Sequence, residues 1–378
     1  MIKSNDKIKM SNMKINNKLK IAFCITCMNR LNHLKKTLIR NIEDNELLGQ
    51  VVFVLLDYNS SDGLHEWVKS QSKYIDNGLL VYFRTDTPTH YKRSHSRNLV
   101  FKLSEADIVC NLDADNYLGK GFAKYVLNEF ENNIDNKIFI TSNCLTRDAF
   151  GKVCVLKEDF IKVGGYDESL TGYGVEDIDL FYRLIKHGYK QIIFENSEFY
   201  DFVHHTNLDR VSQERIFTEI KDVYITYQTP FCIDFIVLYK NFELEMGTLT
   251  NNVLCNFNYK EDFSNVVEMF FDERYRTMLS YPLIKKQWAI TEENNNTFIN
   301  IGEEKCQIDK DHFHFKKGIY YKISNMDILA EFVMNLSDGI NFNTVKLNMN
   351  NKKISVNPNG FGKGFICRNF CSDKIEVI

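Results

Sequence analysis

Short apolar runs alternate with segments of helical spacing over the first third of the chain, and this alternation limits the possible folds more than any other feature. The apolar runs are residues 19–27 (LKIAFCITC), 51–56 (VVFVLL), 79–84 (LLVYFR) and 107–112 (DIVCNL). Between them, apolar side chains recur every three or four residues, as at Leu31, Leu34, Leu38 and Ile42. Strands that alternate with helices form right-handed βαβ units, so we expect an α/β domain with a mainly parallel sheet flanked by helices.

Polar clusters follow three of these apolar runs, at the point where each run ends. They are residues 26–30 (TCMNR), 57–62 (DYNSSD) and 113–116 (DADN). Asp and Asn are common in turns, so one such cluster would indicate little. The carboxyl ends of parallel strands meet at one edge of a sheet, where ligands bind in open α/β folds. The sequence therefore predicts a pocket shared by the three clusters.

The third cluster, Asp113-Ala114-Asp115, offers two carboxylates directly after a strand. Such carboxylates can place oxygen ligands near a divalent ion that also holds a diphosphate. A triplet of this kind also arises by chance in turns, but its position at the sheet edge favours a metal site. On the preceding helix, Arg93 and Arg97 could reach a phosphate; the alternative is that both are solvated helix residues.

Residues 164–190 (GGYDESLTGYGVEDIDLFYRLIKHGYK) combine glycines, aromatic residues and carboxylates in a loop that leads into a helix. Glu176 and Asp177 fall in the first helical turn, where the helix dipole favours acidic residues whatever their function. The dipole does not explain the glycines. Gly172 and Gly174 are costly here unless the backbone approaches something closely. We therefore interpret this stretch as a wall of an active site.

Two adjacent histidines, His204 and His205, follow a strand-like segment downstream of this helix. A single histidine is most often a structural or surface residue. Neutral imidazole suits Mn²⁺-type ions beside carboxylates, so one of the pair is a candidate third metal ligand. Side chains alternate sides along a strand, and therefore only one of the two can face the site.

Composition argues against several classes of protein. The chain has 378 residues, enough for two domains, and a net charge of -3 that gives no reason to expect a nucleic-acid partner. Its 10 cysteines are scattered, and Cys24 and Cys27 have no second CxxC pair, so we expect free thiols in a reducing compartment. The sequence shows neither a signal peptide nor an apolar run of transmembrane length, which predicts a cytoplasmic protein.

The remaining segments are less informative. Residues 1–18 are polar and basic and predict a flexible tail. Residues 211–287 contain stretches of helical spacing, at 211–227 and 263–275, and predict a helical extension. Asparagine-rich turns divide residues 288–378 into short alternating runs, which predicts a small β-rich module. Its runs are NTFINI, KCQI, HFHFKKGIYYKI, NTVKLNM, KKISV and GFICRN. Such a module could hold an acceptor, cover the site, mediate assembly or serve only as structure.

Taken in order, the segments over residues 19–210 resemble the family 2 glycosyltransferases with the GT-A (Rossmann-like) fold. The resemblance is carried by NRLNHLKKTL, DYNSSDG, SRNLVFKL, NLDADN and residues 164–190. The last stretch is especially similar to the carboxyl-terminal part of the catalytic domain in β-1,4-galactosyltransferases and chondroitin-polymerase-type enzymes. A DxD triplet is a weak signal, whereas a glycine–aromatic–glycine loop followed by Glu-Asp-x-Asp is fairly specific.

This resemblance implies roles for individual residues. It implies contacts to the nucleotide-sugar from Thr26, Arg30, Asp57, Arg97, Asp113, Ala114 and Gly174, with Asp57 at the uracil ring and Arg97 near the diphosphate. It implies Mn²⁺ or Mg²⁺ held by Asp115 and His205, with His204 as the alternate and Asp113 nearer the ribose and the metal waters. Asp177 matches the catalytic base, and Glu176 matches a residue that contacts the sugar or acceptor. The chain departs from the family at Tyr58 and Asn59, which replace an acid and a glycine often found there.

We therefore expect a metal-dependent, inverting transfer of a hexose or N-acetylhexosamine from a UDP-sugar to a glycan hydroxyl, in polysaccharide, lipooligosaccharide or capsule synthesis. We also expect the dipole of the helix that begins at Glu176 to keep Asp177 ionised. A lipid-linked acceptor would bring the enzyme to the inner membrane as a peripheral protein.

Two alternatives stay open: a retaining GT-A transferase, and a nucleotide-sugar- or glycan-binding protein without catalysis. The intact carboxylates Asp113, Asp115, Glu176 and Asp177 argue against the second. A dinucleotide enzyme is unsupported, since no GxGxxG follows the first strand.

Overall fold

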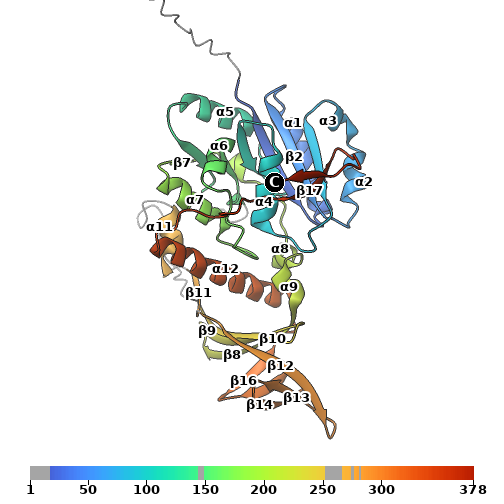
Figure 1. Ribbon diagram of the computed structural model, residues 1–378, viewed down its shortest axis with the longest axis vertical. Coiled ribbons are helices and arrows are strands. Elements are labelled where there is room, and N and C mark those ends of the chain that lie inside the picture. Colours follow the sequence, from blue (N-terminus) through green and yellow to red (C-terminus); the bar gives the residue numbers. More distant parts are fainter. Residues whose placement is uncertain (1–17, 144–148, 252–265, 274–275, 281) are drawn as a thin grey trace, which may run out of the picture.

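The computed structural model describes residues 18–143, 149–251, 266–273, 276–280 and 282–378. The expected flexible tail therefore lies almost entirely outside the described residues, as do Cys144 and Cys255; the other cysteines are free thiols. Figure 1 shows an α/β domain at one end of the molecule, an antiparallel sheet at the other, and helix α12 (Met326–Asn350) between them. Within the described ranges, every helix is too short or too polar to cross a membrane.

A nine-stranded sheet forms the centre of the α/β domain, in the order β18-β17-β3-β2-β1-β4-β6-β5-β7. Its strands are β1 (Ile21–Cys27), β2 (Val51–Tyr58), β3 (Leu80–Thr85), β4 (Ile108–Asn111), β5 (Ile138–Thr141), β6 (Val153–Leu156), β7 (Lys190–Ile193), β17 (Gly364–Arg368) and β18 (Ile375–Val377). Strands β3, β2, β1 and β4 are parallel, as the βαβ alternation predicts.

The complete sheet is mixed rather than mainly parallel. Strand β6 is antiparallel to both β4 and β5, and β17 is antiparallel to β3. Two connections explain the difference. The segment between β5 and β6 is too short for the helical crossover that parallel neighbours need, and β17 arrives from the C-terminal end of the chain.

Helices cover both faces of this sheet, which confirms the predicted α/β class. One face packs against α1 (Leu31–Asn45), α2 (Leu64–Lys69), α3 (Ser72–Asp76) and α5 (Phe122–Asn132). The other face packs against α4 (Arg93–Leu103), α6 (Lys157–Lys162) and α7 (Glu176–Lys186). Successive side chains of β1 point to opposite faces of the sheet. Phe23 packs in the core on the α1 face, and Cys24 packs in the core on the α4 face.

The described strands between residues 220 and 322 form a second sheet, which is antiparallel and closes on itself. Its closed part consists of β8 (Ile220–Thr229), β9 (Cys232–Tyr239), β10 (Glu243–Asn251), β12 (Ile284–Glu293), β13 (Asn296–Ile301), β14 (Glu304–Asp309), β15 (His312–Phe315) and β16 (Gly318–Lys322). The ring is complete because β9 pairs with both β8 and β10. Strand β11 (Thr277–Leu279) extends the sheet beside β10. Trp288, Ile299 and Phe313 fill the interior.

This sheet takes the place of much of the expected helical extension over residues 211–287. Only α8 (Asn207–Val211) and α9 (Arg215–Glu219) are helical near its start, and β8 begins directly afterwards. Helix α11 (Val266–Phe271) falls within the expected helix 263–275, part of which lies outside the described residues. Strand β8 buries Val223 on one face and Tyr224 on the other. Because both faces are buried, β8 lacks the alternation of apolar and polar residues that would predict a strand.

The expected β-rich module over residues 288–378 contains a long helix. The runs between residues 296 and 322 are strands, and GFICRN contains β17, as predicted. NTVKLNM instead belongs to α12, and KKISV is neither helix nor strand. Helix α12 buries Phe332 and Leu336 against the closed sheet and Phe342 against the α/β domain, so tertiary packing on two sides stabilises it.

Candidate active site

A cavity of about 430 Å³ opens at the carboxyl ends of β1 and β4. Its lining comes from the loop after β1, helix α4, the turn at residues 113–115 and the first turn of α7. Residues of α8, α11 and α12 complete it. Two of the three predicted polar clusters therefore meet here: Thr26 and Arg30 from the first, and Asp113, Ala114 and Asp115 from the last.

The cluster after β2 does not line the cavity. Asp57 is fully buried, and its carboxylate accepts hydrogen bonds from the Tyr82 hydroxyl (2.8 Å) and from the Ser60 backbone N–H (2.8 Å). Asp57 therefore lies outside this cavity, and its contact with a uracil ring stays a prediction. In this structure Asp57 stabilises the loop that follows β2.

The side chains of Asp115 and His205 contact each other in the wall of the cavity. The Nε2 atom of His205 lies 2.8 Å from Oδ2 of Asp115, and Arg30 Nη1 lies 3.0 Å from the same oxygen. Burial alone would raise the pKa of Asp115, but the His205 hydrogen bond and the Arg30 charge lower it well below its usual value. His204 is exposed and packs beside Phe202 instead, with ring centroids 4.8 Å apart. The structure therefore places His205, and not His204, at the site.

The segment that carries His205 is fixed against the turn after β4. The backbone N–H of Tyr117 donates to Asp201 O at 2.9 Å. Lys152 is 1% exposed and donates from Nζ to the carbonyl oxygens of Tyr117 (2.6 Å) and Phe199 (2.5 Å). Burial lowers the pKa of Lys152 to about 8. These contacts join two segments far apart in sequence and so hold His205 beside Asp115.

The donor atoms of Asp115 and His205 suit a divalent ion. Their 2.8 Å separation is close to the roughly 3 Å between neighbouring ligands of an octahedral ion, and carboxylate with neutral imidazole is a fitting donor set. Asp113 is directed to other partners, and among the described residues no three His, Cys, Asp or Glu side chains form a metal-binding cluster. The protein therefore offers this pair, and substrate oxygens would have to complete the coordination.

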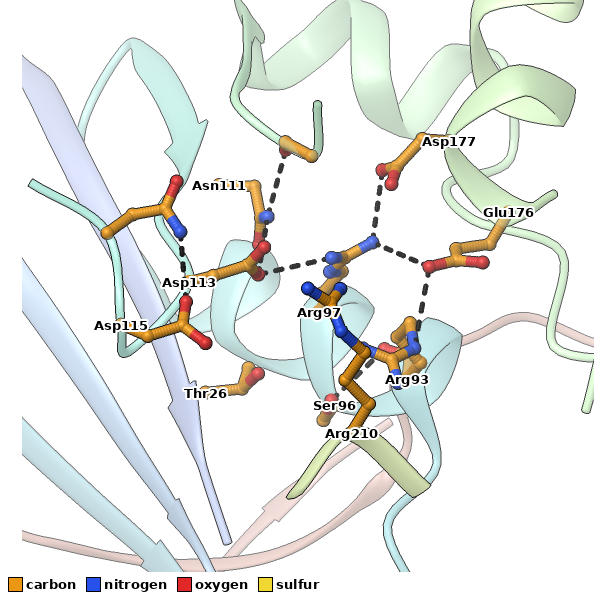
Figure 2. A network of polar contacts seen from close by, with 12 residues as sticks. Thr26, Arg93, Ser96, Arg97, Asn111, Asp113, Asp115, Glu176, Asp177 and Arg210 are labelled. Atoms are coloured by element: carbon orange, nitrogen blue, oxygen red, sulfur yellow. Dashed lines mark hydrogen bonds and ion pairs between the residues drawn. The ribbon is translucent and has the colours of Figure 1, made fainter. Parts of the chain in front are cut away.

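Arg97 lies at the centre of the site, where it contacts three carboxylates (Figure 2). Its Nη1 atom lies 3.0 Å from Asp177 Oδ1 and 3.2 Å from Glu176 Oε1, while Nη2 lies 3.1 Å from Asp113 Oδ1. The side chain is 2% exposed. The sequence predicts a diphosphate contact for Arg97. In the structure its guanidinium group forms ion pairs with Asp113 on one side and with Glu176 and Asp177 on the other.

Asp177 lies in the first turn of α7 and is buried. Burial raises its pKa to about 7, with Arg97 acting in the opposite direction and Glu176 reinforcing the rise. The sequence led us to expect that the helix dipole would keep Asp177 ionised. Burial raises the pKa of Asp177 by more than the helix dipole can lower it, since a helix end contributes only about 0.3–1 kcal/mol. A carboxyl group with a pKa near 7 can both take up and release a proton at neutral pH.

A second buried arginine continues the charge network. Arg93 Nη2 lies 2.6 Å from Glu214 Oε1, and Arg93 Nε lies 3.5 Å from Glu176 Oε1. Burial raises the pKa of Glu214 to about 7, although Arg93 opposes this shift. The side chain of Arg210 extends from α8 into the same region (Figure 2). Glu176 is thus held by two arginines that lie one turn apart on α4.

The glycines of the predicted wall permit close contact with α12. A Cβ on Gly172 would lie 2.8 Å from Ser337 Cβ, and a Cβ on Gly174 would lie 2.5 Å from Asp338 Oδ1. This backbone therefore approaches a neighbour closely, as predicted, and the neighbour is a helix of the same chain. Val175 follows with a φ of 75°, an unfavourable angle for a β-branched residue. It packs in one cluster with Phe342 of α12, which offsets the strain.

Several residues that line or support the cavity were not predicted as site residues. Arg93 is not among them, because the sequence already marks it, together with Arg97, as a candidate phosphate contact on one helical face. Glu214, Arg210 and Asp338 carry no local motif. They reach the site only because α8, α12 and the chain between α8 and α9 fold back over the sheet edge.

Comparison with known proteins supports an enzymatic role. Residues 146–206, which include Glu176, Asp177 and His205, match the family described as the N-terminal domain of galactosyltransferase. A stretch of 55 residues is 38% identical to human chondroitin sulfate synthase 3. That match covers 14% of this chain and 6% of the human protein, so the chain spans only a small part of its relative. At the level of enzyme class, the matched segment identifies the chain as a glycosyltransferase.

Solved glycosyltransferase structures show partial similarity. The mannosyltransferase PcManGT from Pyrobaculum calidifontis, in complex with GDP-Man and Mn²⁺, gives a TM-score of 0.41 at 15% identity over 48% of this chain and 56% of that one. GalNAc-T7 with UDP, GalNAc and Mn²⁺ gives 0.39 at 15% identity over 49% and 45%. TarS from S. aureus with UDP-GlcNAc gives 0.37 at 14% identity over 50% and 63%.

Proposed function

We propose that this glycosyltransferase moves a hexose or N-acetylhexosamine from a UDP-sugar to a glycan hydroxyl, with inversion at the anomeric carbon and with a divalent ion. One observation carries the proposal: a buried carboxyl group, Asp177, shares a single cavity with the Asp115–His205 pair. A base and a candidate diphosphate site thus lie on one GT-A-like sheet edge, as a displacement between donor and acceptor requires.

The acceptor side of the reaction belongs to the first turn of α7. Asp177 accepts the proton of the acceptor hydroxyl while that oxygen bonds to the anomeric carbon. Its pKa near 7 suits this role, because a general base works best when its pKa lies close to the working pH. Arg97 orients Asp177 through the 3.0 Å contact, and Glu176 lies beside it to bind the sugar or acceptor.

The donor side belongs to the turn after β4. Asp115 and His205 would hold the ion, which when bound neutralises negative charge on the departing diphosphate. Arg30, which already contacts Asp115, lies in the cavity wall where it can also bind phosphate oxygens. Thr26 and Asp113 also line the cavity here, and we expect them to contact the nucleotide, with Asp113 nearer the ribose.

A donor screen tests the proposal. UDP-Gal, UDP-GalNAc, UDP-Glc and UDP-GlcNAc are each added with Mn²⁺, and thermal unfolding and UDP release are measured. A bound donor must stabilise the folded state, so one sugar nucleotide should raise the Tm and release UDP. Loss of both effects on chelation supports the role of the ion. If none of the four raises the Tm or releases UDP, the proposal is wrong.

The configuration of the product separates the two transferase mechanisms. Attack by an acceptor oxygen activated by Asp177 occurs opposite the leaving diphosphate and therefore inverts the anomeric carbon. NMR coupling constants of the new linkage report its configuration. A product with the configuration of the donor would instead support the retaining alternative.

A further inference from the structure

A residue of the C-terminal helix, Asp338, lines the cavity beside Gly174, in the loop that leads to Asp177. We propose that Asp338 determines acceptor specificity by binding hydroxyl groups of an uncharged sugar unit that carries the attacking oxygen. This inference rests on the proposed glycosyl transfer and adds the acceptor's chemical class. It concerns a residue far outside the segment that matches the galactosyltransferase family.

The position of Asp338 places a carboxylate next to the catalytic loop. Its Oδ1 atom lies 2.5 Å from where a Cβ on Gly174 would be, two residues before Glu176. Only glycine therefore allows this approach. The Asp338 side chain is 28% exposed and lines the same cavity as Asp177. A sugar hydroxyl bound by Asp338 would therefore be held within the space that also contains the base.

The carboxylate is also fixed in orientation. Arg276 forms an ion pair with Asp338, and its guanidinium carbon lies 3.7 Å from the centre of the Phe342 ring. Arg276 is only 9% exposed and does not line the cavity, so Asp338 is the member of the pair that faces a ligand. A preorganised acceptor group loses less entropy when it binds a hydroxyl.

Helix α12 and the catalytic loop are joined by direct hydrogen bonds. Asn341 Nδ2 donates to Gly174 O at 2.9 Å, and Asn341 Oδ1 accepts from Thr171 N at 3.2 Å. The Tyr173 N–H donates to Ser337 Oγ at 3.2 Å. Because these contacts lie on both sides of Asp338 along the helix, its distance from the first turn of α7 is fixed by the fold.

The surrounding side chains favour a neutral sugar. Tyr173 and Phe270 line the cavity together with Asp338, so aromatic surface for the apolar face of a sugar ring is combined with an acceptor for its hydroxyls. Glu176 and Asp177 add two further carboxyl groups, which pair with Arg93 and Arg97. In the whole lining, four arginines stand against six carboxyl groups. A uronic acid or a phosphorylated sugar would bring like charge against the carboxyl groups, which is unfavourable. A hydroxyl that donates to a carboxylate forms a strong, charge-assisted hydrogen bond.

The test compares uncharged and anionic acceptors. The donor found by UDP release is combined with methyl β-glycosides of galactose, N-acetylgalactosamine, glucose and N-acetylglucosamine, and with methyl β-glucuronide. We expect transfer to a neutral glycoside and at least about tenfold weaker kcat/KM for the glucuronide. Asp338→Asn should raise the acceptor KM about tenfold, well beyond any change in donor KM. It should also reduce the ratio of kcat/KM for the neutral glycoside to kcat/KM for the glucuronide. A purely structural role would not alter that discrimination.

A matched control is available on the same helix. Asp327 lies in the exposed first turn of α12, far along the helix from Asp338, and Asp327→Asn should leave both KM values as in the wild type. Thermal unfolding verifies that each variant is folded, and Asp338→Glu tests whether a displaced carboxylate restores discrimination in part. The inference is overturned if the wild type prefers the glucuronide, or if Asp338→Asn keeps both the acceptor KM and the discrimination. Absence of UDP release from the wild type would instead overturn the proposed function, and the inference with it.

Discussion

Arg97 Nη1 lies 3.0 Å from Oδ1 of Asp177, and the same guanidinium reaches Asp113 on the opposite side of the cavity. One buried cation thereby joins the turn after β4 to the first turn of α7, the proposed donor and acceptor sides. Burial raises the pKa of Asp177, and Arg97 is the main influence that lowers it. Arg97 thus compensates buried negative charge and lowers the pKa of Asp177, the proposed base.

Replacing Arg97 should destabilise the protein strongly. Arg97→Ala leaves Asp113, Glu176 and Asp177 without their shared partner, and removal of one member of a buried ion pair costs about 3–5 kcal/mol. Urea denaturation at pH 7 measures the loss. Arg215→Ala is the control, because Arg215 pairs with Glu219 at the surface with 71% of its side chain exposed. Its change should stay within about 0.5 kcal/mol, and equal losses for the two variants would contradict a central role for Arg97.

Asp177→Asn should abolish most transfer while the protein stays folded. Loss of a general base lowers the rate by about 10²–10⁴-fold, and the amide keeps the size of the side chain. In the wild type, kcat/KM should rise with pH and level off above about pH 7, since the base must be deprotonated. In Asp177→Asn the residual rate should lose this dependence. Transfer that persists at the wild-type level, or an unchanged pH profile, would show that another group removes the proton.

The stability of the protein should show the opposite pH dependence to its activity. Burial raises the pKa of Glu214 from 4.5 to about 7, so the folded state holds a proton over a pH range in which the unfolded chain has lost it. Stabilisation from this group is complete below about pH 4.5 and is lost as the pH rises to about 7. The pKa of Asp177 is raised in the same direction, from 3.8 to about 7.

Glu214→Gln isolates one of these groups, because the amide does not titrate. The urea midpoint should fall less steeply between about pH 4.5 and pH 7 in Glu214→Gln than in the wild type. Measurements at half-unit steps across this window are sufficient. A variant whose stability has the same pH slope as the wild type would show that Glu214 is already ionised at the lower end of the window.

Local pattern was sufficient to predict the parallel half of the α/β sheet. Strands β1 to β4 are buried apolar runs with polar turns at their ends, and each is followed by its own helix or turn. The pattern failed where long-range packing decides the structure. NTVKLNM alternates over a few residues like a strand, yet it forms the last part of α12 because Phe342 and Val345 pack against Leu170 and Val175.

The candidate site likewise contains residues that local pattern predicts and residues that only the fold brings together. Asp115 and Asp177 stand out in the sequence because each belongs to a motif at the end of a strand or the start of a helix. The choice between His204 and His205 depends on how residues 199–203 dock against the turn after β4, which spacing does not reveal. Asp113, Glu176 and Asp177 were predicted as site residues, but their contacts with Arg97 were not, because these contacts join segments far apart in the sequence. Asp338 was missed because only the packing of α12 brings it to the cavity.

The two adjacent histidines provide a matched test of the metal site. His205→Ala removes one of the two predicted ligands, so the Mn²⁺ concentration that gives half-maximal activity should rise at least about tenfold. His204→Ala changes the same residue type one position earlier, at an exposed side chain, and should shift this concentration less than about twofold. Manganese titration of chelator-treated protein gives both values. Equal shifts, or a shift only in His204→Ala, would reject His205 as a ligand.

A second matched pair tests whether α12 fixes the catalytic loop. Gly174 and Gly188 both have positive φ angles, of 97° and 85°, so an alanine is strained at either position by about 1–2 kcal/mol. They differ in their surroundings: an added Cβ meets nothing within 4 Å at Gly188 but lies 2.5 Å from Asp338 Oδ1 at Gly174.

Gly188→Ala should therefore lose stability with little change in kcat. Gly174→Ala should lose more stability and also at least about tenfold in kcat, because the helix and the loop that carries Asp177 must separate, and small displacements of a catalytic group are costly. Urea denaturation and steady-state kinetics measure the two effects. Equal kcat values in the two variants would mean that the first turn of α7 keeps its position without the contact to α12.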